Sequence, residues 1–141
     1  MLQDNLKMTG HLAIAINNEV VQEVPNLVVT SGKAYVASRM KDTTLNAMSH
    51  MAIGTGSAAA AAANTALGSE ADRNSLSSTT VSNGTVTYVA TFGAGECTGA
   101  ITEAALLNAS SGGTMLCRTV FAVVNKGSQD SMTITWSVTV S

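Results

Sequence analysis

The segment MTITWSVTV, residues 132–140, alternates strictly between apolar residues and residues with hydroxyl groups. A period of two is typical of a strand with one buried face. The pattern directs Met132, Ile134, Trp136, Val138 and Val140 inward. In the predicted strands TVTYVATF and MLCRTVFAVV, the large apolar residues likewise fall on one face of the strand. The predicted core therefore consists of Tyr88, Phe92, Phe121, Ile134, Trp136 and Val138.

Turn signals divide the rest of the chain into further short strands. GHLAIAIN and the valines after Asn17-Asn18 predict an N-terminal hairpin that ends at Pro25. MSHMAIGTG predicts another strand, and Asn83-Gly84 is a strong hairpin signal. Together these patterns predict a mainly β protein, an antiparallel sandwich or barrel, as a single domain over residues 1–141.

One helix is expected near residues 31–41. Thr30 or Ser31 can cap it, and helical spacing places Lys33, Val36, Ala37 and Met40 on one weakly apolar side. The stretch SAAAAAANTALG favours helix by propensity, but Gly56 and Gly68 bracket it. An Ala-rich loop over 56–68 and a single short turn are both open at this point.

Two segments have no partner in the predicted sandwich. They are a possible N-terminal arm, residues 1–8, and the Ala-rich loop. We therefore expect them to contact other subunits, and the candidate assembly contacts are Leu2, Leu6, Ala60 and Leu67.

Charge is scarce along the chain. Only 11% of the 141 residues are charged, against roughly 25% in an ordinary domain, and the net charge is −2. Residues 43–69 and 74–95 contain no Asp, Glu, Lys or Arg. A nearly neutral surface resists self-association poorly, so we expect a chain packed against neighbours; the alternative is a monomer with hydroxyl-rich strands.

The same distribution argues against several classes of partner. The seven cations are scattered and the aromatic residues are few, which disfavours nucleic acid. No stretch approaches the ~18 apolar residues of a membrane span. The start of the chain lacks the features of a signal peptide, so synthesis in a cytoplasm is expected.

Three glycines follow the strand that ends at Phe92, in TFGAGECTGAITEAALLN. A dinucleotide fingerprint needs G-x-G-x-x-G before a long helix, but here the second spacing, Gly95 to Gly99, is one residue too long. No Lys-Ser or Lys-Thr pair completes a phosphate loop either. We therefore predict a turn or bulge between two strands.

Candidate ligands and catalytic groups are few. His11, His50, Cys97 and Cys117 show no metal-binding spacing, and the two cysteines are expected to stay unpaired. Ser49 and His50 are neighbours in the sequence and are not expected to form a nucleophile–base pair. Glu96 and Glu103 are expected to rim the turn or to pair with Arg118. These patterns predict no cofactor, no small-molecule substrate and no enzymatic activity.

Several segments, in this order, resemble small structural proteins of tailed bacteriophages. The resemblance rests on NLVVTSGK, MAIGTGSAAAAAANTALGSEADR, GAITEAALLN, GGTMLCRTVF and TITWSV, and covers most of the chain. In particular, the chain is similar to capsid cement (decoration) proteins of podovirus-type heads, although phage tail-fibre proteins contain related sequence motifs. The alanine run is longer than such a motif demands.

The resemblance implies a jelly-roll-like β-sandwich on the outer surface of the virion, bound to the major capsid protein. It would act by contact alone, stapling neighbouring coat subunits. Self-association is expected with it, as a dimer by preference and as a trimer otherwise. The rival hypothesis is a tail-fibre or baseplate module that forms a trimer and touches host glycans.

Overall fold

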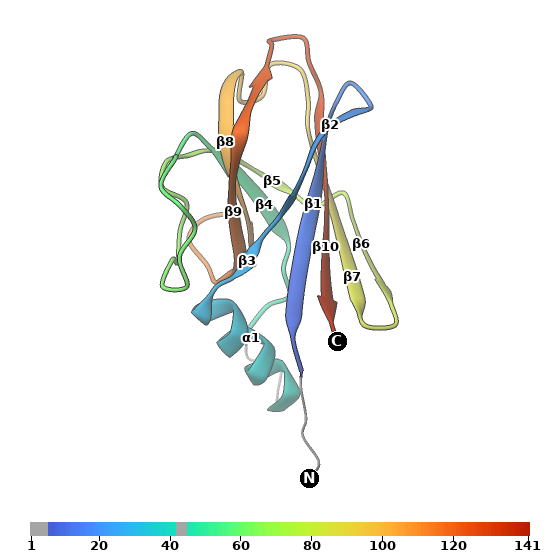
Figure 1. Cartoon of the computed structure of the whole chain (residues 1–141), viewed down its shortest axis with the longest axis vertical. Coiled ribbons are helices and arrows are strands. Elements are labelled where there is room, and N and C mark those ends of the chain that lie inside the picture. Colours follow the sequence, from blue (N-terminus) through green and yellow to red (C-terminus); the bar gives the residue numbers. More distant parts are fainter. Residues whose placement is uncertain (1–5, 42–44) are drawn as a thin grey trace.

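The computed structural model describes residues 6–41 and 45–141, and its described chain is mainly β (Figure 1). Its elements are β1 (Met8–Ile16), β2 (Glu19–Pro25), β3 (Leu27–Val28), α1 (Thr30–Lys41), β4 (His50–Gly54), β5 (Glu70–Ser75), β6 (Ser78–Ser82), β7 (Thr85–Phe92), β8 (Gly99–Leu107), β9 (Met115–Lys126) and β10 (Met132–Val140). The strands form two antiparallel five-stranded sheets. The predicted antiparallel sandwich is confirmed.

Each sheet combines two pairs of consecutive strands with strands that are distant in the chain. The first sheet has the order β2–β1–β10–β7–β6, and the second has the order β3–β9–β8–β4–β5. The chain changes sheet between β2 and β3, β5 and β6, β7 and β8, and β9 and β10. The pairing of β1 with β10 runs in register from Met8 opposite Val140 to Ile16 opposite Met132. This pairing joins the two ends of the described chain at the centre of the first sheet.

In each of the two hairpins of the first sheet, β1–β2 and β6–β7, a turn that contains asparagine joins the two strands. Asn17, Asn18 and Asn83 all have positive φ angles, of 50°, 69° and 54°. Asparagine tolerates this left-handed region better than most residues, and two-residue hairpin turns require it. Both hairpins were predicted from these turn residues.

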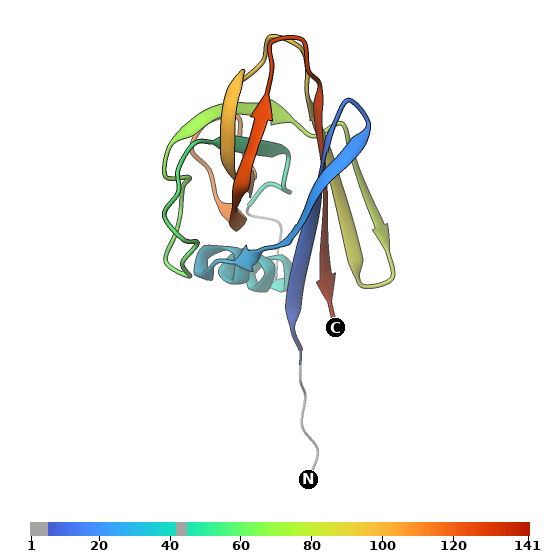
Figure 2. The same ribbon diagram turned by 45° about the horizontal axis from the view of Figure 1, so that its top comes forward.

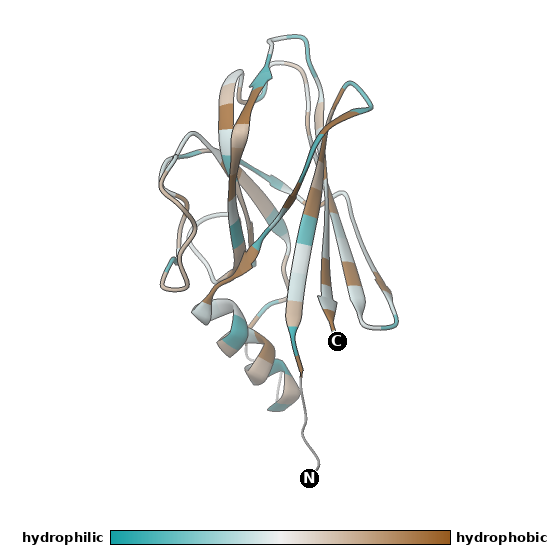
Figure 3. Ribbon diagram, viewed as in Figure 1, coloured by the Kyte–Doolittle hydropathy of each residue, from teal (hydrophilic) through white to brown (hydrophobic). Residues whose placement is uncertain are grey.

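The core lies between the inner faces of the two sheets. All six residues predicted for it are buried: Tyr88, Phe92, Phe121, Ile134, Trp136 and Val138. Burial raises the pKa of Tyr88 to about 12, with smaller contributions from Cys117 and Tyr35. Val140, which was expected to point inward, is 37% exposed at the end of β10. Figure 3 shows the alternation of brown and pale segments along the strands.

Helix α1 lies across one end of the sandwich, beside the second sheet (Figures 1 and 2). Its buried residues are Gly32 and Tyr35. A Cβ atom at Gly32 would collide with the carbonyl of Leu116, so the helix approaches β9 closely because residue 32 is a glycine. The predicted apolar side of the helix therefore differs from the side that is buried against β9.

Two strands were not predicted. β5 carries Glu70, Asp72 and Arg73 and lacks an apolar alternation, and β3 has only two residues. The Ala-rich stretch between β4 and β5 contains no helix. It is a loop that includes a short turn, in which the amide of Asn64 donates to the carbonyl of Ala61 over 3.0 Å.

Trp136→Ala should lower the free energy of unfolding by ~3–5 kcal/mol, because it leaves a large cavity in the core. That is a large share of a total of ~5–15 kcal/mol. Trp136 is 0% exposed, and its indole Nε1 has no hydrogen-bond partner among the described residues. Trp136→Phe should therefore cost less than Trp136→Ala. Chemical denaturation of the three proteins measures the difference, and an unchanged midpoint for Trp136→Ala would contradict it.

Candidate assembly surface

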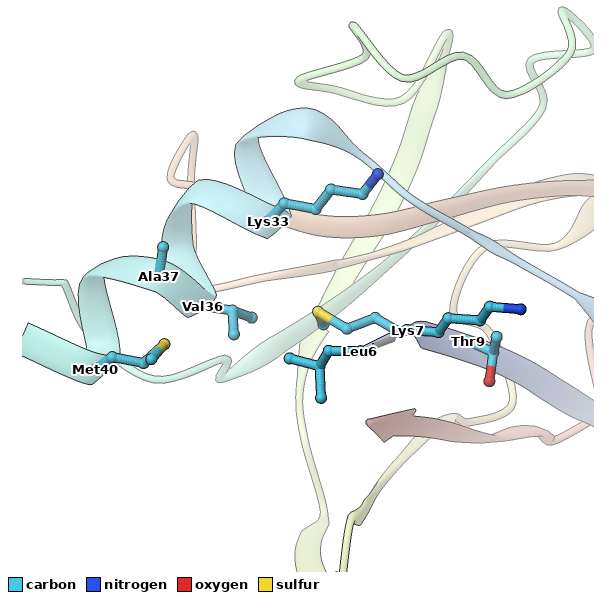
Figure 4. Close-up of a pocket in the computed structure, with 8 residues that line it drawn as sticks. Leu6, Lys7, Thr9, Lys33, Val36, Ala37 and Met40 are labelled. Carbon is cyan, nitrogen blue, oxygen red and sulfur yellow. The ribbon is translucent and has the colours of Figure 1, made fainter. Parts of the chain in front are cut away.

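An apolar groove lies between the segment that leads into β1 and one side of helix α1 (Figure 4). Its volume is about 520 Å³. It is lined by Leu6, Lys7, Met8, Thr9, Lys33, Val36, Ala37 and Met40. Leu6 is 76% exposed and Met40 is 85% exposed, so two large apolar side chains face solvent at the same groove. The helical residues of the groove are the four whose spacing the sequence placed on one side of the helix.

Backbone hydrogen bonds hold the β1 side of this groove. The amide of Lys7 donates to the carbonyl of Ser141 over 2.8 Å, and the amide of Ser141 donates to the carbonyl of Lys7 over 2.9 Å. Met8 already belongs to β1. The predicted arm over residues 1–8 is therefore wrong for Lys7 and Met8, because the sheet pairs them. Leu6 lies exposed at the groove, and Leu2 lies outside the described residues.

The Ala-rich loop is anchored by a buried ion pair in the second sheet. The Glu103 carboxylate is 0% exposed and accepts hydrogen bonds from the backbone amides of Gly56, Gly68 and Ser69, over 2.7–2.8 Å. The guanidinium of Arg118 lies 2.9 Å from the same carboxylate. Glu103 and Arg118 lie diagonally across neighbouring strands, so of the two alternatives that the sequence left open, Glu103 takes the pairing with Arg118.

Arg118 extends the anchor to the middle of the loop. It donates to the carbonyl of Ala58 over 3.0 Å and to Oδ1 of Asn64 over 2.9 Å. The amide of Thr30, the first residue of α1, donates to the carbonyl of Ala62 over 2.8 Å. The sandwich therefore does supply partners for the loop, contrary to the sequence-based expectation.

This anchoring changes the assignment of two candidate contacts. Leu67 is only 9% exposed and belongs to a small apolar cluster inside the chain, with Val29, Ala52, Ala105, Leu107 and Met115. The prediction that Leu67 contacts another subunit is therefore wrong, because this side chain is buried inside its own chain. Ala60 is half-buried and lines a shallow depression beside β3.

Opposing effects set the pKa of Glu103. Burial raises it, but the hydrogen bonds from Ser69, Arg118, Gly68 and Gly56 outweigh burial and lower the pKa of this carboxyl below its usual value. The carboxylate is therefore charged at neutral pH although it is buried. Its full set of donors identifies it as a structural group.

The glycine-rich segment after β7 is a turn between two strands, which confirms the prediction. Residues 93–98 join β7 to β8, and Gly95 has a φ of 82°. The Glu96 carboxylate accepts from the Gly93 amide over 2.9 Å and from the Asn74 side chain over 2.8 Å. The buried Lys126 ammonium donates to the Gly93 carbonyl over 2.7 Å. The amide and carbonyl of Gly93 are thus both occupied by the protein's own side chains.

Ser49 and His50 form a contact that the sequence did not predict. The Ser49 hydroxyl lies 2.7 Å from Nδ1 of His50, and Nε2 of His50 lies 3.4 Å from the hydroxyl of Ser75. Ser75 faces His50 across the β4–β5 ladder. A hydroxyl on the second ring nitrogen does not stabilise an imidazolium as a carboxylate would, so the geometry lacks the third member of a catalytic triad. In the described ranges, no three His, Cys, Asp or Glu residues gather in a way that could hold a metal ion.

Hydroxyl groups line the β7 and β10 part of the outer face of the first sheet. Thr85 and Thr139 lie 2.9 Å apart through their hydroxyls, and Thr91 and Thr133 lie 3.0 Å apart in the same way. Both are cross-strand pairs of the β7–β10 ladder. Because these hydroxyls satisfy each other, this part of the face is polar without being charged.

Comparison with known proteins gave no match to a family model, to a curated protein or to a solved structure. In residues 6–41 and 45–141, no helix has both the length and the apolar character that crossing a membrane requires.

Glu103→Gln should lower the free energy of unfolding by about 3–5 kcal/mol, because it leaves the Arg118 guanidinium buried without its counter-charge. The matched control is Glu70→Gln, which removes the more exposed Glu70–Arg73 pair and should cost ~0–1 kcal/mol. Denaturant titration of both variants measures the contrast. Equal costs would contradict a structural role for the buried pair.

The same pair predicts a pH dependence. The pKa of Glu103 is lowered in the folded chain, so its stabilisation is complete above the unfolded value of ~4.3 and is lost as the pH falls through the folded value. The stability of the wild type should therefore fall more steeply in acid than that of Glu103→Gln. Parallel slopes for the two proteins would refute this.

The two cysteines should differ in reactivity. Both are free thiols; Cys117 is 0% exposed in the core and Cys97 is half-buried in the turn before β8. Burial raises the pKa of both thiols. Intact mass after alkylation of the native protein should show slow modification of Cys97 alone, and denaturation should release the second thiol. Modification of Cys117 in the native state would show that the core opens readily.

Proposed function

We propose that this protein is a structural component of a tailed-phage virion that binds the outside of the assembled capsid and staples neighbouring major coat subunits. The observation that carries the proposal is a surface with very little charge that also exposes large apolar side chains in a groove. The sequence resemblance to cement proteins supplies the choice of partner. The proposal requires no cofactor, nucleic acid, membrane or small molecule.

The surface supports a protein that acts by contact. The hydroxyl ladder on the first sheet can exchange its hydrogen bonds with another protein surface at little electrostatic cost, because no buried charge has to be desolvated. Charged residues are depleted at the centre of protein interfaces. The absence of charged residues from positions 43–69 and 74–95 suits such an interface.

The groove supplies an apolar contact of defined position. Leu6 and Met40 line opposite sides of it, and both are largely exposed. An apolar side chain of a coat subunit would bury both residues. Lys7 and Lys33 flank the groove and are available to pair with carboxylates around such a contact.

Stapling follows if the protein offers two such contacts at once. A dimer presents the same groove twice, related by a two-fold axis, and a closed shell contains local two-folds between equivalent coat subunits. Two weak contacts on one lattice gain by effective concentration. Binding should therefore be strong to assembled shells and weak to free coat subunits.

The central test is removal and replacement of the protein on purified phage heads. Stripped heads should rupture at lower temperature or under milder osmotic shock, and adding the protein back should restore their resistance. A stained gel of whole particles should show hundreds of copies. Equally robust stripped heads, or a few copies found only with tails, would overturn the proposal and favour the tail-fibre or baseplate module.

Variants of the groove should separate shell binding from folding. Leu6→Glu and Met40→Glu each place a charge on an exposed groove position. For each variant we expect shell binding to fall at least roughly tenfold, with little change in melting temperature. The matched control is Val123→Glu, at a valine on β9 that is 53% exposed and does not line the groove. Co-sedimentation with stripped heads measures binding. Equal binding by all three variants would exclude the groove as the contact.

A further inference from the structure

The four edge strands of the sandwich differ sharply in how they are protected against pairing with another chain. β2 carries Glu19, Glu23 and Pro25, and its ladder with β1 contains a register shift. β5 carries Glu70, Asp72 and Arg73, and its ladder with β4 is also shifted. β3 is only two residues long. Charge, proline, bulges and brevity are the usual means by which proteins block an edge.

β6 has none of these features. Its sequence is STTVS, without charge, proline or glycine, and its ladder with β7 runs without a register shift. All five residues are exposed, including Val81 at 70%. In Figures 1 and 2 the β6–β7 hairpin stands at the outer side of the first sheet, away from helix α1. Among the described residues no strand other than β7 pairs with β6.

The ladder of the hairpin determines which backbone groups of β6 point outward. The amide of Val140 donates to the carbonyl of Gly84, so the even-numbered residues of β7 bond to β10 and the odd-numbered ones bond to β6. Ser82 opposite Thr85 is then the hydrogen-bonded pair that closes the two-residue turn. The N–H and C=O groups of Thr79 and Val81 are therefore directed away from β7.

We propose that β6 pairs antiparallel with β6 of a second copy of this chain, joining the two first sheets into one continuous ten-stranded sheet. A two-fold axis perpendicular to the sheet makes the edge self-complementary. With the axis at Thr80, the outward groups of Thr79 meet those of Val81 of the second copy, and the reverse pair forms on the other side of the axis. Each pair contributes two backbone hydrogen bonds.

The side chains suit this arrangement. Thr80 faces Thr87 in the β6–β7 ladder and lies on the hydroxyl-bearing outer face, so the axis brings together uncharged groups. Val81 lies on the other face, opposite Val86, and pairing covers part of its exposed surface with Thr79 of the second copy. No like charges approach each other, because residues 74–95 are uncharged.

This inference deepens the proposed function, because it rests on the self-association that stapling requires and names the surface that provides it. It places the dimer axis on the β6 edge and leaves both grooves uncovered for the shell. The dimer forms without the shell, so it can be tested on the purified protein alone.

Two variants and one matched control test the edge. Thr79→Pro removes an N–H that does not serve the β6–β7 ladder, and proline is tolerated at such edge positions. Val81→Lys adds the charge that guards natural edges. The control is Val20→Lys, at another exposed valine (57%, against 70% for Val81), on the opposite edge of the same sheet.

Sedimentation equilibrium over a range of concentrations should give the mass of two chains for the wild type and for Val20→Lys, and of one chain for Thr79→Pro and Val81→Lys. Amide hydrogen exchange at Thr79 and Val81 should slow as the concentration of wild-type protein rises, while exchange at Val20 and Val21 stays constant. Circular dichroism verifies that the variants are folded.

The results distinguish this inference from the proposed function. A monomeric wild type, or Thr79→Pro and Val81→Lys that are folded dimers, would overturn the β6 edge. If both variants misfold, concentration-independent exchange at Thr79 and Val81 in the wild type overturns it. Failure of the wild type to bind stripped heads, with an intact β6 dimer, refutes stapling and leaves the edge standing.

Discussion

Burying the carboxylate of Glu103 imposes a constraint on which the second sheet and its surroundings depend. A buried charge is tolerated only with a complete set of partners, and here the partners come from three backbone amides at the two ends of one loop and from Arg118. The loop of residues 55–69 is thereby closed around the ion pair. Through Ala62 it also holds the first turn of helix α1. The Glu103 carboxylate is thus linked, through the loop, to the start of the helix that forms one side of the groove.

Buried core residues alternate with surface residues along strand β10. Trp136 and Ile134 pack between the sheets, while Thr133 and Thr139 beside them form hydroxyl pairs on the outside. The arrangement of the second sheet depends on the buried Glu103–Arg118 ion pair, and that of the first sheet depends on the alternation of apolar residues along its strands. The hydroxyl pairs of β7 and β10 carry no charge, so this part of the outer face is polar and neutral.

The alternation of MTITWSVTV and the Asn-Gly turn were sufficient to predict strands β6, β7 and β10. They also showed which residues of β10 form the core around Trp136, because the pattern of a half-buried strand repeats every two residues. Strand β5 was missed because its charged residues face solvent or loop segments at an edge, where no apolar pattern is needed. The anchoring of Leu67 and the Ala-rich loop could not be predicted. It depends on amides of residues 56, 68 and 69 meeting Glu103, a long-range match that propensity does not encode. The groove itself was not predicted: the spacing on α1 identified one weakly apolar side of the helix, but its position beside Leu6 depends on the fold.

The pairing of β1 with β10 has a consequence for how the chain acquires its structure during synthesis. Met8 leaves the ribosome before its ladder partner Val140, and all the other strands of the described chain are translated between β1 and β10. The centre of the first sheet therefore forms late, and contacts between such distant residues slow folding. Until β10 arrives, β1 and β7 each lack a neighbour and expose apolar faces. During that interval the exposed apolar faces of β1 and β7 are open to association with other chains.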